Sequence, residues 1–125
     1  MSGLLDTSVF VARERGRPLE SLTDEGRVSV ITVAELRIGV LVADEPSIRA
    51  QRMRTLSEVE ALDPLPVDDA AARAFAEIVA DSRRRGKRPK ILDALIGATA
   101  SSRAMPVYTQ DAGFEDMAGV QVVRV

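Results

Sequence analysis

Short apolar runs alternate along the chain with segments whose apolar residues recur at helical spacing. The first such run, Leu4 and Leu5, predicts a very short buried strand that ends at Asp6. A helix is expected through residues 9–12, because capping hydroxyls precede this segment and Gly16 follows it. The chain therefore passes from strand to helix at its first acidic residue.

The next segments repeat this order over a longer stretch. Residues 18–24 are expected to form a polar connection with room for one helical turn, and the β-branched run at residues 28–31 predicts a second strand. Thr32 is the expected N-cap of a helix over residues 33–42. A second helix over residues 46–59 begins with a proline and is expected to run antiparallel to the first.

The second half of the chain continues the alternation. Residues 61–67 contain two prolines, so we expect a short strand at an edge or end of the sheet. A helix rich in small residues follows from Asp68 to the basic residues before Gly86. Pro89 opens a further helix that is nearly all apolar or small, which predicts a buried helix whose one acid, Asp93, is out of keeping with its surroundings.

Two short apolar runs near the end of the chain, residues 106–108 and 120–123, predict the last strands, with a turn or short helix around Phe114 between them. The strands are apolar throughout rather than alternating in polarity. This pattern is typical of a parallel sheet that helices cover on both faces. We therefore expect an α/β fold, an open parallel sheet with helices on both faces, formed by residues 1–125 as a single domain.

Composition narrows the chemistry that the chain can perform. Hydrophobic residues make up 46% and charged residues 29%, which is typical of a folded soluble protein. The chain has no cysteine and no histidine, which excludes disulfides, thiolate zinc sites and imidazole bases. The start of the chain shows no signal-type segment, and no run approaches the length of a membrane span, so we expect a cytoplasmic protein.

Charge is unevenly distributed along the chain. The net charge is −2, whereas nucleic-acid-binding domains usually present a basic face. Aromatic residues make up only 3%, which argues against stacking platforms for bases. Six cations nevertheless fall within one short segment, either as a solvated charge run or as a contact for a nucleic-acid backbone: Arg83, Arg84, Arg85, Lys87, Arg88 and Lys90.

Four isolated acids, Asp6, Glu35, Asp93 and Asp111, each stand near the junction between an apolar run and a helix start or turn. Each also has a purely structural explanation. Asp6 and Asp111 suit N-cap or turn positions, and Glu35 follows Thr32 by three residues, which is the spacing of a capping box. Asp93 is the hardest to explain in this way, because burying a lone acid among apolar residues is costly.

The predicted fold would bring these acids together. Residues just past the carboxyl ends of adjacent parallel strands converge on one crevice. Unpaired carboxylates in such a crevice would repel one another by about 4 kcal/mol per close pair at an effective dielectric constant near 20. Hard cations such as Mg²⁺ or Mn²⁺ take oxygen ligands and would offset this repulsion. The acids therefore predict a metal site suited to hydrolysis of a phosphodiester.

The sequence around each acid resembles an acidic motif of the PIN-domain ribonucleases, in the same order and at similar spacing. The four segments span nearly the whole chain: residues 4–8 (LLDTS), 32–36 (TVAEL), 92–100 (LDALIGATA) and 108–114 (YTQDAGF). The Asp-Thr-Ser start and the Asp-Ala-Leu-Ile helix are similar to the VapC toxin branch in particular.

This resemblance implies an Mg²⁺-dependent endoribonuclease, with Mn²⁺ as the alternative ion, that acts as the toxin of a toxin-antitoxin pair. Such a toxin cleaves structured cellular RNA, either tRNA or rRNA, through water that the metal activates, and so arrests translation and growth. The resemblance also implies that Asp6, Glu35, Asp93 and Asp111 are catalytic metal ligands. Ser8 and Thr109 would support them as hydroxyls behind the ligands, although a turn or capping role is the alternative for both.

The chain departs from the family pattern at Gly113, where relatives often carry a further acid, and Asp116 is interpreted as a surface acid. The basic segment would contact RNA, because it leads directly into the helix of Asp93. Three arginines, Arg13, Arg15 and Arg17, are expected to lie away from the acids as surface or partner contacts.

The predicted helices over residues 33–59 carry more apolar surface than one layer of short strands can cover. We therefore expect a homodimer and a cognate antitoxin protein docked on this surface, with no membrane contact. An arginine of the antitoxin entering the acid cluster would inhibit by replacing the charge of the metal.

Three other assignments are less consistent with the residues. A HAD-like phosphotransferase also begins with an acid at a strand end but requires a second Asp two residues later, where this chain has Ser8. A receiver domain requires paired acids after the first strand, which Asp6 and Thr7 do not supply. A catalytically inactive PIN-fold binding module remains an alternative, although all four acids are present.

Overall fold

A computed structural model describes residues 2–19, 23 and 25–125. In this part of the chain, four strands form one sheet in the order β2-β1-β3-β4, and every neighbouring pair is parallel. The strands are β1 (Ser2–Leu5), β2 (Glu25–Arg27), β3 (Val107–Thr109) and β4 (Val122–Arg124). The predicted open parallel sheet is confirmed.

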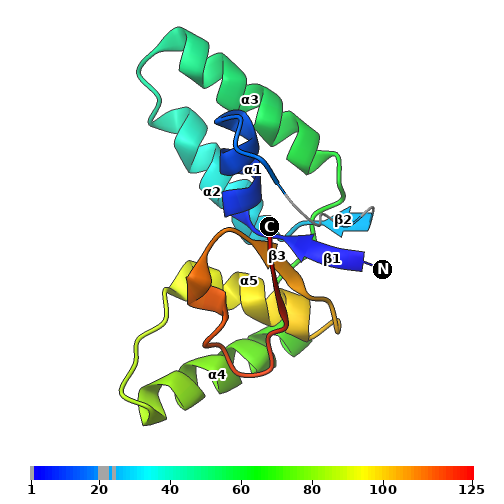
Figure 1. Ribbon diagram of the computed structural model, residues 1–125, viewed down its shortest axis with the longest axis vertical. Coiled ribbons are helices and arrows are strands. Elements are labelled where there is room, and N and C mark those ends of the chain that lie inside the picture. Colours follow the sequence, from blue (N-terminus) through cyan, green and yellow to red (C-terminus); the bar gives the residue numbers. More distant parts are fainter. Residues whose placement is uncertain (1, 20–22, 24) are drawn as a thin grey trace.

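Helices cover the sheet on both faces, as expected. Helices α1, α2 and α3 lie on one side of the sheet, and α4 and α5 lie on the other (Figure 1). The helices are α1 (Thr7–Glu14), α2 (Val30–Leu41), α3 (Pro46–Glu60), α4 (Asp69–Arg84), α5 (Ile91–Ser101) and the short 3₁₀ helix η1 (Ala112–Phe114). None of the described helices is long and apolar enough to cross a membrane.

Strand β1 lies at the centre of the sheet, between β2 and β3. The chain leaves β1 towards β2 on one side and returns on the other side to β3, so the direction of strand order reverses between β1 and β3. Leu4 pairs with Val107, and the Asp6 amide donates a hydrogen bond to the Tyr108 carbonyl at 3.0 Å. Because ligands bind at such reversal points in open α/β sheets, the loops after β1 and β3 form the expected site.

Two apolar clusters hold the helices on the sheet. One joins β1 and β3 to α4 and α5, and it includes Leu4, Ile78, Ile96, Val107 and Phe114, all almost fully buried. The other joins α1, α2 and α3 through Phe10, Val28, Leu36, Leu56 and Val59. Burying a side chain of this size stabilises the fold by roughly 1.5–3 kcal/mol, so the clusters fix the helix starts relative to the strand ends.

The predicted strand at residues 28–31 is wrong. Strand β2 ends at Arg27, and Val30 and Ile31 already belong to α2. Ser29 is the N-cap of this helix, since its side chain accepts a hydrogen bond from the Ile31 amide at 3.0 Å. The expected N-cap, Thr32, is instead a fully buried residue inside the helix. Capping by Ser29 and burial against the sheet override the β propensity of the run.

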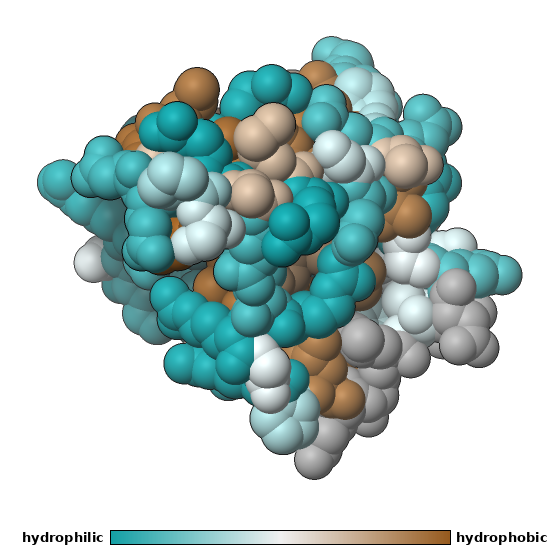
Figure 2. All heavy atoms as spheres, turned by 90° about the horizontal axis from the view of Figure 1, so that it is seen from above, coloured by the Kyte–Doolittle hydropathy of each residue, from teal (hydrophilic) through white to brown (hydrophobic). Residues whose placement is uncertain are grey.

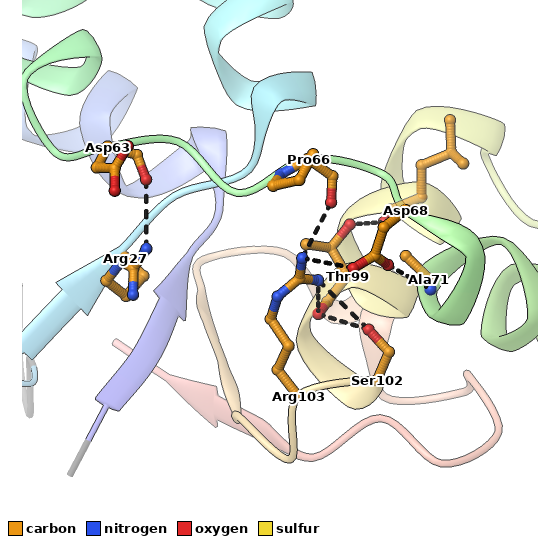
Figure 3. Close-up of polar contacts among 9 residues, drawn as sticks. Arg27, Asp63, Pro66, Asp68, Ala71, Thr99, Ser102 and Arg103 are labelled. Atoms are coloured by element: carbon orange, nitrogen blue, oxygen red, sulfur yellow. Dashed lines mark hydrogen bonds and ion pairs between the residues drawn. The ribbon is translucent and has the colours of Figure 1, made fainter.

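The predicted strand at residues 61–67 is also wrong, since the described residues show only an isolated bridge between Ser29 and Leu65. Arg103 anchors this connection to the end of α5 (Figure 3). Its guanidinium donates to the Pro66 carbonyl and to Asp68 Oδ2, both at 3.2 Å, and to the Thr99 carbonyl at 3.1 Å. The connection is thus held by side-chain hydrogen bonds rather than by a sheet ladder.

The remaining elements differ from the predictions mainly at their ends. Helix α5 begins at Ile91 rather than at Pro89, and its first two residues, Ile91 and Leu92, are 51% and 44% exposed. The expected burial of this helix therefore begins only at Ala94. The turn around Phe114 is η1, as expected. Residues 20–22 and 24 of the predicted polar connection lie outside the described residues.

Candidate active site

Asp6 follows β1 directly and is the N-cap of α1. Its Oδ2 accepts hydrogen bonds from the Ser8 hydroxyl at 2.7 Å, the Thr109 hydroxyl at 2.9 Å and, more weakly, the Ser8 amide at 3.4 Å. The residue is only 3% exposed. Three donors on one oxygen fix the orientation of this carboxylate at the crevice between β1 and β3.

The two hydroxyls also bind the loop that follows β3. The Gln110 amide donates to Ser8 Oγ at 3.0 Å, and the Asp111 amide donates to Thr109 Oγ1 at 2.9 Å. Each hydroxyl therefore accepts from a backbone amide of this loop and donates to Asp6. The arrangement joins the first and last acidic segments of the chain.

Glu35 lies in the second turn of α2 and so does not follow a strand directly. Its Oε1 accepts a hydrogen bond from the Thr7 hydroxyl at 2.7 Å, and Thr7 Oγ1 lies 3.0 Å from Thr32 Oγ1. The capping-box alternative for Glu35 is wrong, because Ser29 rather than Thr32 caps the helix. Thr7 connects the first turn of α1 to the acid on α2.

Asp93 lies in the first turn of α5 and is partly buried. Burial, together with the charges of Asp6, Asp111 and Glu35, raises the pKa of Asp93 from 3.8 to about 6, against a smaller opposing effect of Lys90. The fourth acid, Asp111, is the N-cap of η1, and its Oδ1 accepts from the Gly113 amide at 2.9 Å. The charges of the other three carboxylates thus all act on Asp93.

All four acids line a single hollow of about 410 Å³. The lining residues come from the β1–α1 junction, α2, the start of α5 and the loop after β3: Asp6, Thr7, Ser8, Val11, Ala12, Arg15, Arg17, Glu35, Lys90, Asp93, Gln110 and Asp111. The structure therefore brings together the four predicted acids and the Ser8 hydroxyl, and the Thr109 hydroxyl lies behind them on Asp6.

Two arginines were misplaced by the sequence interpretation. Arg15 and Arg17 line the acid hollow instead of lying away from it. Arg13, by contrast, points to α3, where it pairs with Glu58 at 2.5 Å. The spacing of Thr7, Val11 and Arg15 could have revealed this, because residues four apart share one face of a helix.

The basic segment divides between two hollows. Lys90 lines the acid hollow. Arg83, Lys87 and Arg88 line a second one of about 600 Å³, together with Val79, Gly86, Pro89 and Ile91. Arg84 and Arg85 line neither of these hollows.

The donor set suits a hard divalent cation. No group of three acidic side chains in the described ranges is already arranged as a metal-binding cluster. The four acids of the hollow nevertheless offer carboxylate oxygens, and Mg²⁺ commonly binds through one or two carboxylates while keeping several waters. Burial and the three neighbouring acids disfavour the charged form of Asp93, which raises its pKa, and a bound cation would offset this repulsion. The carboxylates of the hollow thus have the donor chemistry that a water-rich divalent cation requires.

Fold and site together define an open parallel α/β protein with an acidic crevice at the reversal of strand order. A family model described as "PIN domain" matches residues 3–120, and the chain belongs to this family. It is 46% identical over 129 residues to "Ribonuclease VapC5" of Mycobacterium tuberculosis, covering 99% of this chain and 96% of that protein. It is also 44% identical over 100 residues to "Ribonuclease VapC8" of the same species, covering 78% and 89%.

The fold matches a solved structure of the same kind. The crystal structure of VapBC-5 from Mycobacterium tuberculosis, described as a member of the VapBC family of toxin-antitoxin systems, aligns with a TM-score of 0.86. The sequence identity is 45%, and the alignment covers 99% of this chain and 98% of the other. The resemblance to the PIN-domain family is confirmed, and VapC nucleases of this family are generally metal-dependent.

Proposed function

We propose that this protein is an Mg²⁺-dependent endoribonuclease that acts as the toxin of a toxin-antitoxin pair. The observation that carries the proposal is the convergence of four carboxylates on one hollow at the β1–β3 crevice. Similar proteins named as ribonucleases and a similar toxin-antitoxin structure support it. The substrate is structured cellular RNA, either tRNA or rRNA, and cleavage in the cytoplasm arrests translation and growth.

Asp6, Glu35, Asp93 and Asp111 would hold Mg²⁺, or Mn²⁺ in its place. When bound, such a cation activates water and neutralises charge on the reacting phosphate. The surrounding hydroxyls restrict the motion of these carboxylates: Ser8 and Thr109 orient Asp6, and Thr7 orients Glu35. Preorganised ligands avoid the cost of ordering them when substrate binds.

Cations next to the acids would bind the RNA backbone. Lys90, Arg15 and Arg17 line the acid hollow and are exposed, so they can contact phosphates on either side of the cleaved bond. The other cations of the segment, Arg83, Arg84, Arg85, Lys87 and Arg88, extend this surface along the end of α4. A net charge of −2 is compatible with RNA binding because the acids would be neutralised by the cation.

The α2–α3 hairpin would bind the partners of this protein. Large apolar residues are exposed on it, and Leu41 and Val42 are the most accessible at 73% and 65%. Figure 2, which views the molecule from the hairpin end, shows hydrophobic residues among hydrophilic ones on this face. Ile38, Ile48 and Met53 add to the same surface. Exposed apolar surface of this kind marks protein interfaces, and we assign it to the antitoxin and to a homodimer.

Induced expression tests the proposal in cells. Wild-type protein should arrest growth and produce discrete cuts in tRNA or rRNA, whereas Asp6→Asn should do neither at equal expression. Arg13→Gln is a matched control that alters a surface ion pair on α1 and should retain toxicity. Co-expression of a neighbouring antitoxin gene should restore growth. Arrest by Asp6→Asn as strong as that by wild type would contradict the proposal.

A further inference from the structure

We propose that Asp116 is a positioning residue for RNA binding, which holds the basic segment (residues 83–90) against the loop that follows Asp111. The inference rests on the proposed ribonuclease function. The sequence interpretation of Asp116 was a surface acid, and the residue is indeed exposed. Its contacts, however, join two parts of the chain that each adjoin a residue of the acid hollow.

Asp116 binds the basic segment with its side chain and with its backbone. Its Oδ1 accepts from Arg85 at 3.4 Å, its Oδ2 pairs with the Lys87 ammonium, and its carbonyl accepts from Arg85 at 2.8 Å. Arg85 also pairs with Asp81 on α4 at 2.8 Å. Among the described residues, every polar side-chain contact between the basic segment and residues 112–119 involves Asp116.

Each of the two joined segments leads to the acid hollow. The basic segment ends at Lys90, the residue that precedes α5 and its acid Asp93. Residues 112–119 begin immediately after Asp111. The inner side of this loop is seated on α5 through the buried residue Met117, whose Sδ lies 3.0 Å from the position that a Cβ on Gly97 would occupy. Packing of Met117 on α5 already holds this loop, and Asp116 adds a second contact, to the basic segment.

The network also divides the cations into two groups. Arg85 and Lys87 are engaged with Asp81 and Asp116, and Lys87 and Arg85 lower the pKa of Asp116, so that its carboxylate stays ionised. The side chains of the other four make no hydrogen bond or ion pair with another described residue: Arg83, Arg84, Arg88 and Lys90. These four are available to phosphate, and Asp116 determines where the segment presents them.

The kinetics of Asp116→Asn can distinguish this positioning role from a purely electrostatic effect, because the two predict changes of KM in opposite directions. Removing an acid from an RNA-facing surface ordinarily strengthens phosphate binding and lowers KM. If Asp116 positions the cations, its loss should instead raise KM by roughly threefold, a size typical of surface ion pairs, with little change in kcat. Glu115→Gln is the matched control, since this adjacent acid is exposed and pairs with Arg124 outside the basic segment.

A double-mutant cycle with Lys87→Gln tests whether Asp116 acts through its partner. The double variant should bind RNA no more weakly than the weaker single variant, because both changes break the same contact. Strictly additive effects would overturn the proposal, as would a KM for Asp116→Asn at or below the wild-type value.

Hydrogen exchange tests the attachment without RNA and therefore independently of the ribonuclease function. Backbone amides at residues 86–88 should exchange several-fold faster in Asp116→Asn than in wild type or in Glu115→Gln. Unchanged exchange would overturn the proposal even if the enzyme is inactive. The two claims can also fail separately. If the wild-type protein cleaves no RNA but exchange is still faster in Asp116→Asn, the result would count against the ribonuclease function alone.

Discussion

The Thr109 hydroxyl donates a hydrogen bond to Asp6 Oδ2 across 2.9 Å, although 103 positions separate the two residues in the sequence. The same hydroxyl accepts from the Asp111 amide. One side chain thus connects the acid at the end of β1 to the acid that begins η1. Parallel pairing of β1 with β3 makes this contact possible, since it places the two strand ends side by side.

Replacing Thr109 with valine should lower both activity and stability. Valine keeps the shape but removes the donor to Asp6 and the acceptor of the Asp111 amide. We expect cleavage to fall by about 10- to 100-fold, the usual effect of losing support behind a metal ligand. The free energy of unfolding should fall by about 1–3 kcal/mol. Initial cleavage rates and urea unfolding measure the two effects.

Thr55→Val is the matched control for this substitution. Thr55 is also a buried threonine, at 6% exposure, but its hydroxyl bonds the Gln51 carbonyl within α3. Its loss should leave cleavage near the wild-type rate. Equal losses of activity in the two variants would show that Thr109 has no special connection to the acids.

Arg15→Gln should weaken RNA binding, because Arg15 lines the acid hollow and is exposed. KM should rise, and the slope of log affinity against log salt should decrease in magnitude by about one unit for each phosphate that the variant no longer neutralises. Arg13→Gln, on the same helix but paired with Glu58, should leave both quantities unchanged. A salt slope unchanged by Arg15→Gln would remove this residue from the RNA-binding surface.

The errors of the sequence analysis have a common physical cause. Local propensity predicted a strand that includes Val30 and Ile31, yet capping by Ser29 starts α2 at Val30. The same propensity rules correctly predicted the start of α3 at Pro46 and the helix after Asp68. Local patterns therefore predicted most helices, and they failed where an N-cap starts a helix inside a β-branched run.

The acids could be found from their junction positions and motifs, but their surroundings could not. Glu35 reaches the hollow from the second turn of α2, and its partner Thr7 lies 28 residues away. Arg15 reaches it from the far end of α1. Both placements depend on how α1 packs against the sheet and α2, which sequence spacing alone does not specify.

Asp93→Asn should stabilise the metal-free protein at neutral pH. The pKa of Asp93 is about 6 in the folded protein against 3.8 in the unfolded chain, so the folded state binds the proton more tightly. This tighter proton binding stabilises the folded state fully below pH 3.8, and the stabilisation is lost as the pH rises through 6. With a discount for partial exposure, the variant should be more stable by about 1–2 kcal/mol above pH 7.

Urea unfolding in a chelator at pH 7.5 and pH 4.5 measures this effect. The advantage of Asp93→Asn should shrink at the lower pH, where the wild-type carboxyl is mostly protonated. Asp69→Asn, an exposed acid that pairs with Arg73, is the control and should show no such pH dependence. A variant that is less stable than wild type at pH 7.5 would contradict the crowding of charge around Asp93.

Added Mg²⁺ should stabilise the wild-type protein against heat. A ligand that binds only the folded state at 100 times its Kd adds about 2.7 kcal/mol. Asp6→Asn should lose most of this gain, whereas Asp69→Asn should keep it, since Asp69 lies outside the acid hollow. Thermal melts in Mg²⁺ and in chelator measure the difference. Equal increases of the melting temperature on addition of Mg²⁺ in all three proteins would show that the cation binds outside the acid hollow.

The most direct test of the central claim is cleavage of structured RNA by purified protein, with wild type compared with Asp6→Asn and Asp93→Asn in Mg²⁺ and in chelator. The carboxylate site predicts that wild type cleaves only with a divalent cation and that both folded variants fall to the level seen in chelator. Cleavage by either variant at the wild-type rate, or by wild type in chelator, would contradict it.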